Sequence, residues 1–251
     1  MTRHVARVAR IFFTGTAFVV FWLGGAFLAW VIFPLIRLRH RRHPTVAVRR
    51  CRLLLNRSLR LHAGYMRFFR LIAFDSRSVE RQVPRGGFVM VANHPSLIDA
   101  VLLLSTFPTL YCVVKGSVMR SPFVGSMLRY CNHIDAGDGD PVSGANVVQG
   151  AIERLQSGDP VLIFPEGTRS PSSGVAPFKR GAFAIAQAAG VPVVPIRIDC
   201  HPRGLKRGQK WYQVPDGTMH YRFRLFPPRL PAEYAGDAAA MARDVRSLFL
   251  D

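Results

Sequence analysis

The sequence predicts an α/β fold, with a mixed, largely parallel sheet flanked by helices and an N-terminal helical membrane anchor. Three observations lead to this fold class. Residues 11–36 form a run of 26 residues without a charge. After Asp75, short apolar segments alternate with helix-like segments, which is typical of strands joined by helical crossovers. The segments 162–164 and 193–194 are apolar without alternation, as strands covered on both faces require.

The basic charge of the chain is concentrated in its first third. The formal net charge of the 251 residues is +19. Residues 1–74 contain 14 Arg, no Lys and no acidic residue, whereas the remainder has 20 basic and 15 acidic residues. Such a composition suits nucleic acid or anionic lipid. The basic residues adjoin the apolar run and lack aromatic interleaving on a soluble basic surface, so we expect membrane lipid as a partner and no nucleic acid.

Residues 11–36 are long enough to cross a hydrocarbon core of about 30 Å. The run continues into a cluster of arginines at 37–42 rather than a small-residue cleavage site, which argues against a cleaved signal peptide. The basic cluster after the run is denser than the one before it, which predicts a cytoplasmic (inner) membrane location with the catalytic domain on the cytoplasmic face. Gly24, Gly25 and Pro34 also permit a bent, re-entrant helix, so spanning and re-entrant anchors both remain open.

Residues 45–74 predict a second, amphipathic helix. Its arginines fall mostly on one side of a helical wheel and its leucine and phenylalanine residues mostly on the other, as in helices that lie in an anionic membrane surface. The alternative is a charged face that is solvated while the helix packs on a soluble core. We therefore expect a membrane anchor over residues 1–75 and an α/β domain over residues 76–251.

The α/β domain has five strand candidates and five helix candidates. The strands are expected at 87–92, 110–114, 160–164, 191–198 and 219–226, and the helices at 96–107, 123–130, 142–156, 178–189 and 238–250.

His94 and Asp99 are the first candidate catalytic pair. They follow the strand expected at 87–92, and Pro95 suits the first position of a helix. Positions five apart within one helix point about 140° away from each other, so the pair meets only if His94 lies in the loop and Asp99 in the helix. A carboxylate that orients an imidazole is the minimal apparatus for removing a proton from a hydroxyl. The alternative is a histidine that only caps the helix.

A second candidate stretch, residues 164–170, follows the strand expected at 160–164. Glu166 and Arg169 place a carboxylate and a bidentate donor in one turn, where Gly167 allows close backbone approach and Arg169 suits a phosphate. A local ion pair that closes the loop is the alternative. Ligands of open α/β sheets bind beyond the carboxyl ends of strands, and both stretches occupy that position.

Cations at other strand ends favour an anionic substrate. Lys115 follows the strand expected at 110–114, and Lys179 begins the helix expected near 178. Four further cations form a basic loop that either receives phosphates or an acidic carrier protein, or is solvated: Arg203, Lys206, Arg207 and Lys210.

Several other classes of site lack their motifs. There is no GxSxG elbow, P-loop or GxGxxG, and the four cysteines form no CxxC pair. The histidines lack metal-ligand spacing, and His133 with Asp135 is a minor pair that would not meet on a strand. We expect no metal site and no bound cofactor.

The two main stretches together resemble the glycerolipid acyltransferases typified by 1-acylglycerol-3-phosphate acyltransferase, whose signatures are HxxxxD and FPEGTRS. Residues 178–181 and 191–196 are similar to further family blocks, and Lys115 fits a lysine that often follows the intervening strand. The resemblance covers roughly residues 85–230. It implies that His94 is the general base and Asp99 its orienting partner, and that Glu166, Gly167, Thr168, Arg169, Lys115 and Lys179 serve substrate binding.

The implied reaction moves an acyl chain from acyl-CoA or acyl-ACP, as co-substrate, to a hydroxyl of a lysophospholipid-like acceptor, with phosphatidic acid as the default product. One block departs from the family: residues 130–136 lack the glycine, aromatic and arginine of the GxxFxxR block that binds the acceptor phosphate. A non-glycerophosphate acceptor, or a non-catalytic membrane adaptor on the same fold, therefore remains an alternative.

Overall fold

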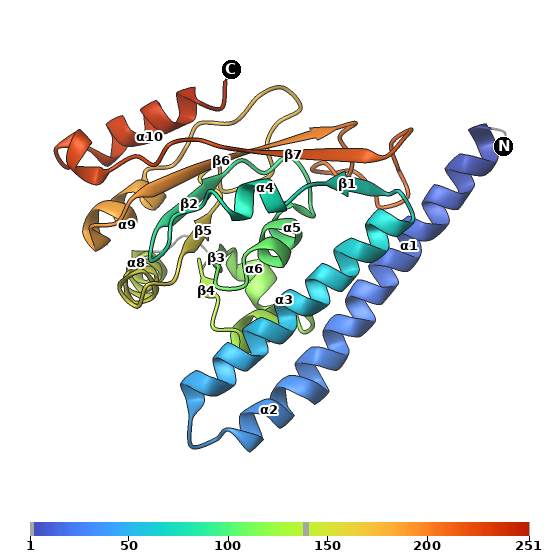
Figure 1. Cartoon of the computed structure of the whole chain (residues 1–251), viewed down its shortest axis with the longest axis horizontal. Coiled ribbons are helices and arrows are strands. Elements are labelled where there is room, and N and C mark those ends of the chain that lie inside the picture. The colour runs from blue at the N-terminus through green and yellow to red at the C-terminus, as the bar shows by residue number, and fades with distance from the viewer. Residues whose placement is uncertain (1–2, 138–140, 251) are drawn as a thin grey trace.

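Two long antiparallel helices form the N-terminal part of the protein. The computed structural model describes residues 3–137 and 141–250. Helix α1 (Arg3–Phe27) continues through a π-helical turn, η1 (Leu28–Ile32), into α2 (Phe33–Arg39), and α3 (Pro44–Phe68) runs back beside it (Figure 1). Within the described ranges, the continuous helix His4–Arg39 is the one helix long and apolar enough to cross a membrane.

Helix α3 ends earlier than the sequence predicts. The expected helix 45–74 stops at Phe68, and residues Ile72–Phe74 form strand β1 instead. Arg70 has a φ of 53°, in the left-handed region that cannot continue a right-handed helix. The amide of Leu71 then donates to the carbonyl of Met66 and closes the helix end. Residues 72–74 pair with a strand of the sheet, so this prediction was wrong for the last turns.

The sheet is mixed and largely parallel, as predicted. Its order is β1-β7-β6-β2-β5-β3-β4, and each neighbouring pair is parallel except β6 with β7. All five expected strands are present, and β1 and β4 are additional. The further strands are β2 (Val89–Ala92), β3 (Tyr111–Val114), β4 (Ile134–Asp135), β5 (Val161–Ile163), β6 (Val193–His201) and β7 (Met219–Leu225).

Helices cover both faces of the sheet. Met90 and Ala92 of β2 face a core shared with α3 and α5, whereas Val89 and Val91 face one shared with α8, α9 and α10. Strand β2 is therefore buried on both sides, which explains its continuous apolar sequence, whereas β7 alternates buried and exposed residues. The helices are α4 (Arg77–Glu80), α5 (Asp99–Thr106), α6 (Gly116–Met119), α7 (Val124–Tyr130), α8 (Pro141–Gln156), α9 (Gly181–Ala189), η2 (Pro231–Tyr234) and α10 (Ala238–Ser247).

Helix α3 joins the N-terminal helices to the α/β domain. The side chains of Asn56 and Arg60 both donate to the carbonyl of Ser105, in the last turn of α5. Those donors satisfy carbonyls that have no partner within the helix. Part of the arginine face of α3 therefore fixes this helix to α5.

The register of β2 and β5 brings the two candidate stretches together. Val91 of β2 is paired with Ile163 of β5. His94 and Glu166 each lie three residues beyond this pair, at the same edge of the sheet. Adjacent parallel strands thus deliver the two loops to one place, as the strand-end argument predicts.

Candidate active site

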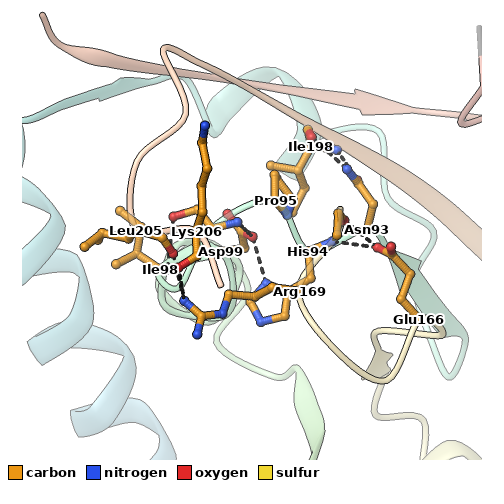
Figure 2. Close-up of polar contacts among 12 residues, drawn as sticks. Asn93, His94, Pro95, Ile98, Asp99, Glu166, Arg169, Ile198, Leu205 and Lys206 are labelled. Atoms are coloured by element: carbon orange, nitrogen blue, oxygen red, sulfur yellow. Dashed lines mark hydrogen bonds and ion pairs between the residues drawn. The ribbon is translucent and has the colours of Figure 1, made fainter. Parts of the chain in front are cut away.

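His94 and Asp99 form a close pair. His94 lies in the loop after β2, and Asp99 is the first residue of α5. The Nδ1 atom of His94 is 2.8 Å from Oδ2 of Asp99 (Figure 2). The side chain of Asp99 is 0% exposed and that of His94 is 19% exposed, so only the imidazole can meet a substrate. The pair meets because the helix begins after His94, as its spacing predicts.

Burial raises the pKa of the Asp99 carboxyl, and three neighbours oppose the rise. The hydrogen bond with His94, the backbone N–H of Ser96 at 2.7 Å and the charge of Arg203 all favour the carboxylate. The second oxygen, Oδ1, is buried and has no hydrogen-bond partner within the described residues. A carboxylate in this setting gains most when the imidazole beside it becomes positively charged, because their attraction is strong in a medium of low dielectric.

The imidazole is held on two sides. Its ring stacks on that of Phe164, with the centroids 4.3 Å apart and the planes at 22°. With a proton on Nδ1 facing Asp99, Nε2 is the unprotonated nitrogen and the hydrogen-bond acceptor of the ring. The ring is therefore oriented for proton removal by Nε2. Phe164 is the first residue of the FPEGTRS stretch, but no local pattern in the sequence indicates this stacking.

The carboxylate of Glu166 is buried between the two loops. Oε1 accepts hydrogen bonds from the His94 amide at 3.2 Å and the Ser170 hydroxyl at 2.5 Å, and Oε2 accepts one from the Ala176 amide at 2.8 Å. The Ser170 amide in turn donates to the His94 carbonyl at 2.8 Å. Glu166 and Ser170 thus fix the backbone that bears the histidine. The alternative Glu166–Arg169 ion pair is not among the contacts of the described residues.

Arg169 and Arg203 connect the site to the loop between β6 and β7. Arg169 donates through Nη1 to the carbonyls of Leu205 and Lys206, at 2.8 and 2.9 Å. Arg203 donates to the carbonyls of Pro95 and Ser170, at 3.1 and 3.2 Å. It also bonds the carbonyls of Pro171 and Ser172. One guanidinium thus holds the loop after β2 against the loop after β5, a role that the sequence did not indicate.

Four of the expected substrate-binding residues lie on the outer surface of the site. Gly167, Thr168, Lys179 and Lys115 are exposed. A Cβ atom on Gly167 would come within 3.0 Å of Nζ of Lys179, so this lysine lies over the turn. Lys115 follows β3, which is separated from β2 by β5, and it has no described contact with His94. The structure therefore groups Lys179 with the Gly167 turn and leaves Lys115 farther along the edge.

The minor pair His133 and Asp135 does not meet. His133 is buried, and its Nδ1 accepts the amide proton of Cys112 at 2.9 Å. Asp135 is exposed and accepts from the Gly137 amide. Burial lowers the pKa of His133 to about 3, which keeps it neutral. Among the described residues, no group of three His, Cys, Asp or Glu side chains could hold a metal ion.

Two further residues support the loop after β2. The side chain of Asn93 exchanges two hydrogen bonds with the backbone of Ile198, at 2.7 and 2.9 Å. Tyr221 of β7 donates to Oγ of Ser96 at 2.9 Å, and burial raises the pKa of this phenol, which keeps its proton in place. The sequence contains no local signal for either contact, because each partner lies more than a hundred positions away.

The sequence is similar to known acyltransferases. Residues 76–199 match the family described as Acyltransferase. The chain is 36% identical over 110 residues to a chloroplastic 1-acyl-sn-glycerol-3-phosphate acyltransferase of Brassica napus, covering 44% of this chain and 32% of the relative. It is 31% identical over 169 residues to the enzyme of that name from Pseudomonas aeruginosa, covering 67% of this chain and 63% of the relative. The chain thus spans about a third and just under two thirds of these proteins.

The fold is similar to that of a solved structure. The crystal structure of the 1-acyl-sn-glycerophosphate acyltransferase PlsC from Thermotoga maritima superimposes with a TM-score of 0.69. The match covers 99% of this chain and 95% of that chain, at 24% sequence identity. This comparison supports the whole fold, including the N-terminal helices.

Proposed function

Because residues 76–199 place this chain in the acyltransferase family, we propose that it is an O-acyltransferase that makes phosphatidic acid from 1-acylglycerol-3-phosphate and an acyl thioester. The observation that supports this most is the His94–Asp99 contact of 2.8 Å, with the imidazole partly exposed and the carboxylate buried. Both sequence relatives are named as 1-acyl-sn-glycerol-3-phosphate acyltransferases, which agrees with this proposal.

His94 acts as the general base. Nε2 takes the proton from the acceptor hydroxyl as its oxygen attacks the thioester carbonyl carbon, and Asp99 stabilises the imidazolium that forms. The tetrahedral intermediate then collapses, the C–S bond breaks, and the thiolate of coenzyme A or acyl carrier protein takes the proton from the imidazolium. Direct transfer needs no acyl-enzyme, consistent with an imidazole whose described partners are Asp99 and Phe164 and not a nucleophile.

Substrate phosphates bind on the exposed side of the turn. Lys179 and the residues Gly167 and Thr168 are the nearest exposed candidates, and Lys115 extends the positive edge. Arg169 contributes positive charge while its guanidinium is held by two carbonyls. Glu166 serves binding indirectly, since its hydrogen bonds fix the turn that presents the other residues.

The helices α1 to α3 attach the enzyme to a membrane. Large apolar side chains of α1 and η1 are exposed, Phe12 and Trp30 among them. The Arg-rich α3 packs along α1 and is fixed to α5, so a perpendicular span would draw α3 and the domain into hydrocarbon. This packing favours a helical hairpin that enters one leaflet. The basic cluster at residues 37–42 favours the cytoplasmic leaflet of the inner membrane.

The division into an anchor over residues 1–75 and a catalytic domain over 76–251 is part of the same proposal. Strand β1, at Ile72–Phe74, belongs to the sheet, so the anchor in the functional sense ends with α3.

A non-glycerophosphate acceptor is the second candidate. Where the family resemblance expects a phosphate-binding arginine, this chain has Ala136, whose amide bonds the carbonyl of Val114 next to Lys115. Without that arginine there are two alternatives. Either Lys115 and Lys179 bind the phosphate of the acceptor, or the acceptor carries no phosphate.

Product analysis by mass spectrometry tests these proposals. Purified protein is offered acyl-CoA or acyl-ACP with 1-acylglycerol-3-phosphate, a zwitterionic lysolipid, or a monoacylglycerol. We expect phosphatidic acid from the first acceptor. Acylation of monoacylglycerol instead would support the second candidate, whereas no transfer from either donor would favour a membrane adaptor.

A further inference from the structure

The loop between β6 and β7, residues 202–218, contains an exposed cluster of cations and aromatic rings. Arg203 points inward to its four carbonyl partners. Farther along, Arg207, Lys210, Trp211 and Tyr212 are exposed and Lys206 is half-buried, and Asp216 is the one acid in the loop. We call Lys206, Arg207, Lys210, Trp211 and Tyr212 the basic–aromatic loop. Within the part of the chain that the structure describes, none of the three cations forms an ion pair with an acidic side chain.

This loop lies against α1. A Cβ atom on Gly15 would come within 3.0 Å of the Trp211 ring, so the indole rests on the helix at Gly15. Phe12 and Val19 lie three residues before and four after Gly15, which places them on the same side of α1. They are 62% and 55% exposed, and Trp211 is 47% exposed. Trp211 therefore extends the exposed apolar stripe of α1 onto the loop.

The same loop is attached to the active site. The carbonyls of Leu205 and Lys206 accept the hydrogen bonds of Arg169, and the Leu205 carbonyl also accepts the amide proton of Leu97. Leu97 lies between His94 and Asp99 in the sequence. The loop thus bridges the helix proposed to enter the membrane and the catalytic loop.

We propose that the basic–aromatic loop is a second membrane-contact site, which binds the headgroup phosphates of an anionic bilayer. Three cations match the charge of such a surface, and tryptophan and tyrosine favour the depth of the headgroups. The apolar stripe of α1 continues directly into Trp211. Because the loop adjoins α1 and is hydrogen-bonded to the His94 loop through Leu97 and Leu205, the active site lies beside the bilayer and the acceptor hydroxyl reaches His94 without leaving the lipid phase.

This inference rests on the proposed attachment of α1 to the membrane. Tryptophan fluorescence distinguishes the membrane contact of the loop from that of α1. The chain has three tryptophans, Trp22, Trp30 and Trp211. The full-length W22F/W30F variant reports on the loop alone, and the W211F variant reports on the anchor alone. Each is reconstituted with vesicles of phosphatidylcholine and phosphatidylglycerol that contain brominated acyl chains. We expect quenching in both variants.

Quenching of the W211F variant without quenching of Trp211 would overturn the second contact and leave the anchor standing. If W211F is not quenched, the anchor itself fails. Quenching of Trp211 in phosphatidylcholine alone, with no gain on addition of phosphatidylglycerol, would overturn the recognition of anionic phosphates.

Charge removal provides the second test. The variant K206Q/R207Q/K210Q is compared with the control R222Q/R224Q/R243Q, which loses the same charge from exposed positions of β7 and α10. Arg222 and Arg224 alternate with Tyr221 along β7 and so point away from its core face. The preference for anionic over neutral vesicles should fall roughly fivefold for each loop charge removed, and much less in the control.

An equal fall in both variants would overturn the proposal, because net charge alone would then explain the binding. The loop would instead bind the donor if the loop variant kept its vesicle preference and showed a raised KM for acyl-CoA or acyl-ACP. That result would also overturn it. Circular dichroism of all variants confirms that each is folded.

Discussion

Nδ1 of His94 lies 2.8 Å from Oδ2 of Asp99, although the two residues belong to a loop and to the helix that follows it. The same carboxylate oxygen accepts the amide proton of Ser96 at 2.7 Å. The carboxylate is therefore fixed by two donors and shielded from solvent, while the imidazole keeps one side accessible. This asymmetry supports the roles proposed for the two residues, because only the accessible group can exchange a proton with a substrate.

Replacing Asp99 by Asn should abolish most of the activity while preserving the fold. The amide is nearly isosteric, but it no longer stabilises the imidazolium and it favours the wrong tautomer of His94. A loss of roughly a thousandfold to ten-thousandfold in kcat is expected by analogy with hydrolase triads. Steady-state kinetics with 1-acylglycerol-3-phosphate measures it, and a loss below tenfold would contradict the orienting role.

The same variant should change how stability depends on pH. The folded pKa of Asp99 is raised above its ordinary value of 3.8, chiefly by burial. The folded state therefore binds this proton more tightly than the unfolded state, and its stability falls as pH rises from 3.8 through the folded pKa. Asp99→Asn has no such loss, so its melting temperature should rise relative to the wild type as pH increases over this window. If the difference in melting temperature between the variant and the wild type did not change with pH, the pKa of the Asp99 carboxyl would not be raised by folding.

Gly167→Ala should impair substrate binding, and Gly174→Ala provides its control. Both glycines have a left-handed φ, of 70° and 68°, so each alanine should cost about 1 kcal/mol of stability. Only the Cβ atom at 167 meets another group, Nζ of Lys179 at 3.0 Å, whereas the one at 174 has nothing within 4 Å. We expect KM for the phosphate-bearing acceptor to rise roughly fivefold in Gly167→Ala alone. Equal KM values in the two variants would exclude this role of the turn.

Arg203→Lys and Arg203→Gln separate the geometry of the arginine from its charge. Neither replacement can hold four carbonyls from two loops, so kcat should fall about tenfold to a hundredfold in both. Lysine keeps the positive charge that lowers the pKa of Asp99, so only glutamine should move the acid limb of the rate profile to higher pH. His94, Tyr221 and Cys200 also interact electrostatically with the Asp99 carboxyl, and all of these residues are kept in the variants. Arg222→Gln is the control. If the pH–rate profiles of all three variants had the same acid limb, the effect of the Arg203 charge on the pKa of Asp99 would be contradicted.

His133→Gln should make the protein more resistant to acid without affecting catalysis. His133 has a folded pKa of about 3 against an ordinary 6.5, so only the unfolded chain takes up its proton between these values. Stability then falls as pH decreases from 6.5, by up to about 1.4 kcal/mol per pH unit. Glutamine keeps an acceptor for the Cys112 amide and does not titrate. Chemical unfolding at several pH values should show a shallower decline, and an identical decline would refute the assignment.

The five strands and five longer helices that the sequence predicted for the α/β domain were predictable because their apolar patterns are strong, whereas the short α4, α6 and η2 were not predicted. The sequence also predicted the contact of His94 with Asp99, since their spacing requires His94 in the loop and Asp99 in the helix, although α5 begins at Asp99 and not directly after Pro95 as expected. It did not predict β1, because residues 72–74 continue the apolar pattern of α3 and only the backbone of Arg70 ends that helix. Strand β4 is two residues long, too short for any periodic signal.

The support around the dyad could not be read from sequence. Arg203 belongs to a run of cations that looks uniform, yet its guanidinium turns inward while Arg207 and Lys210 stay exposed. Glu166 was expected to serve substrate binding, and no sequence pattern indicates that donors from its own loops surround its carboxylate. Such choices depend on which backbone carbonyls and amides lack partners after folding, and this is a property of tertiary structure.

Acyl transfer by His94→Ala tests the account most directly. Purified wild-type and variant proteins are compared in phospholipid vesicles with acyl-CoA and 1-acylglycerol-3-phosphate, with phosphatidic acid quantified by mass spectrometry. We predict that the variant loses its activity while it keeps the vesicle binding and melting temperature of the wild type. Undiminished phosphatidic acid formation by the variant would contradict the role of His94 as the base.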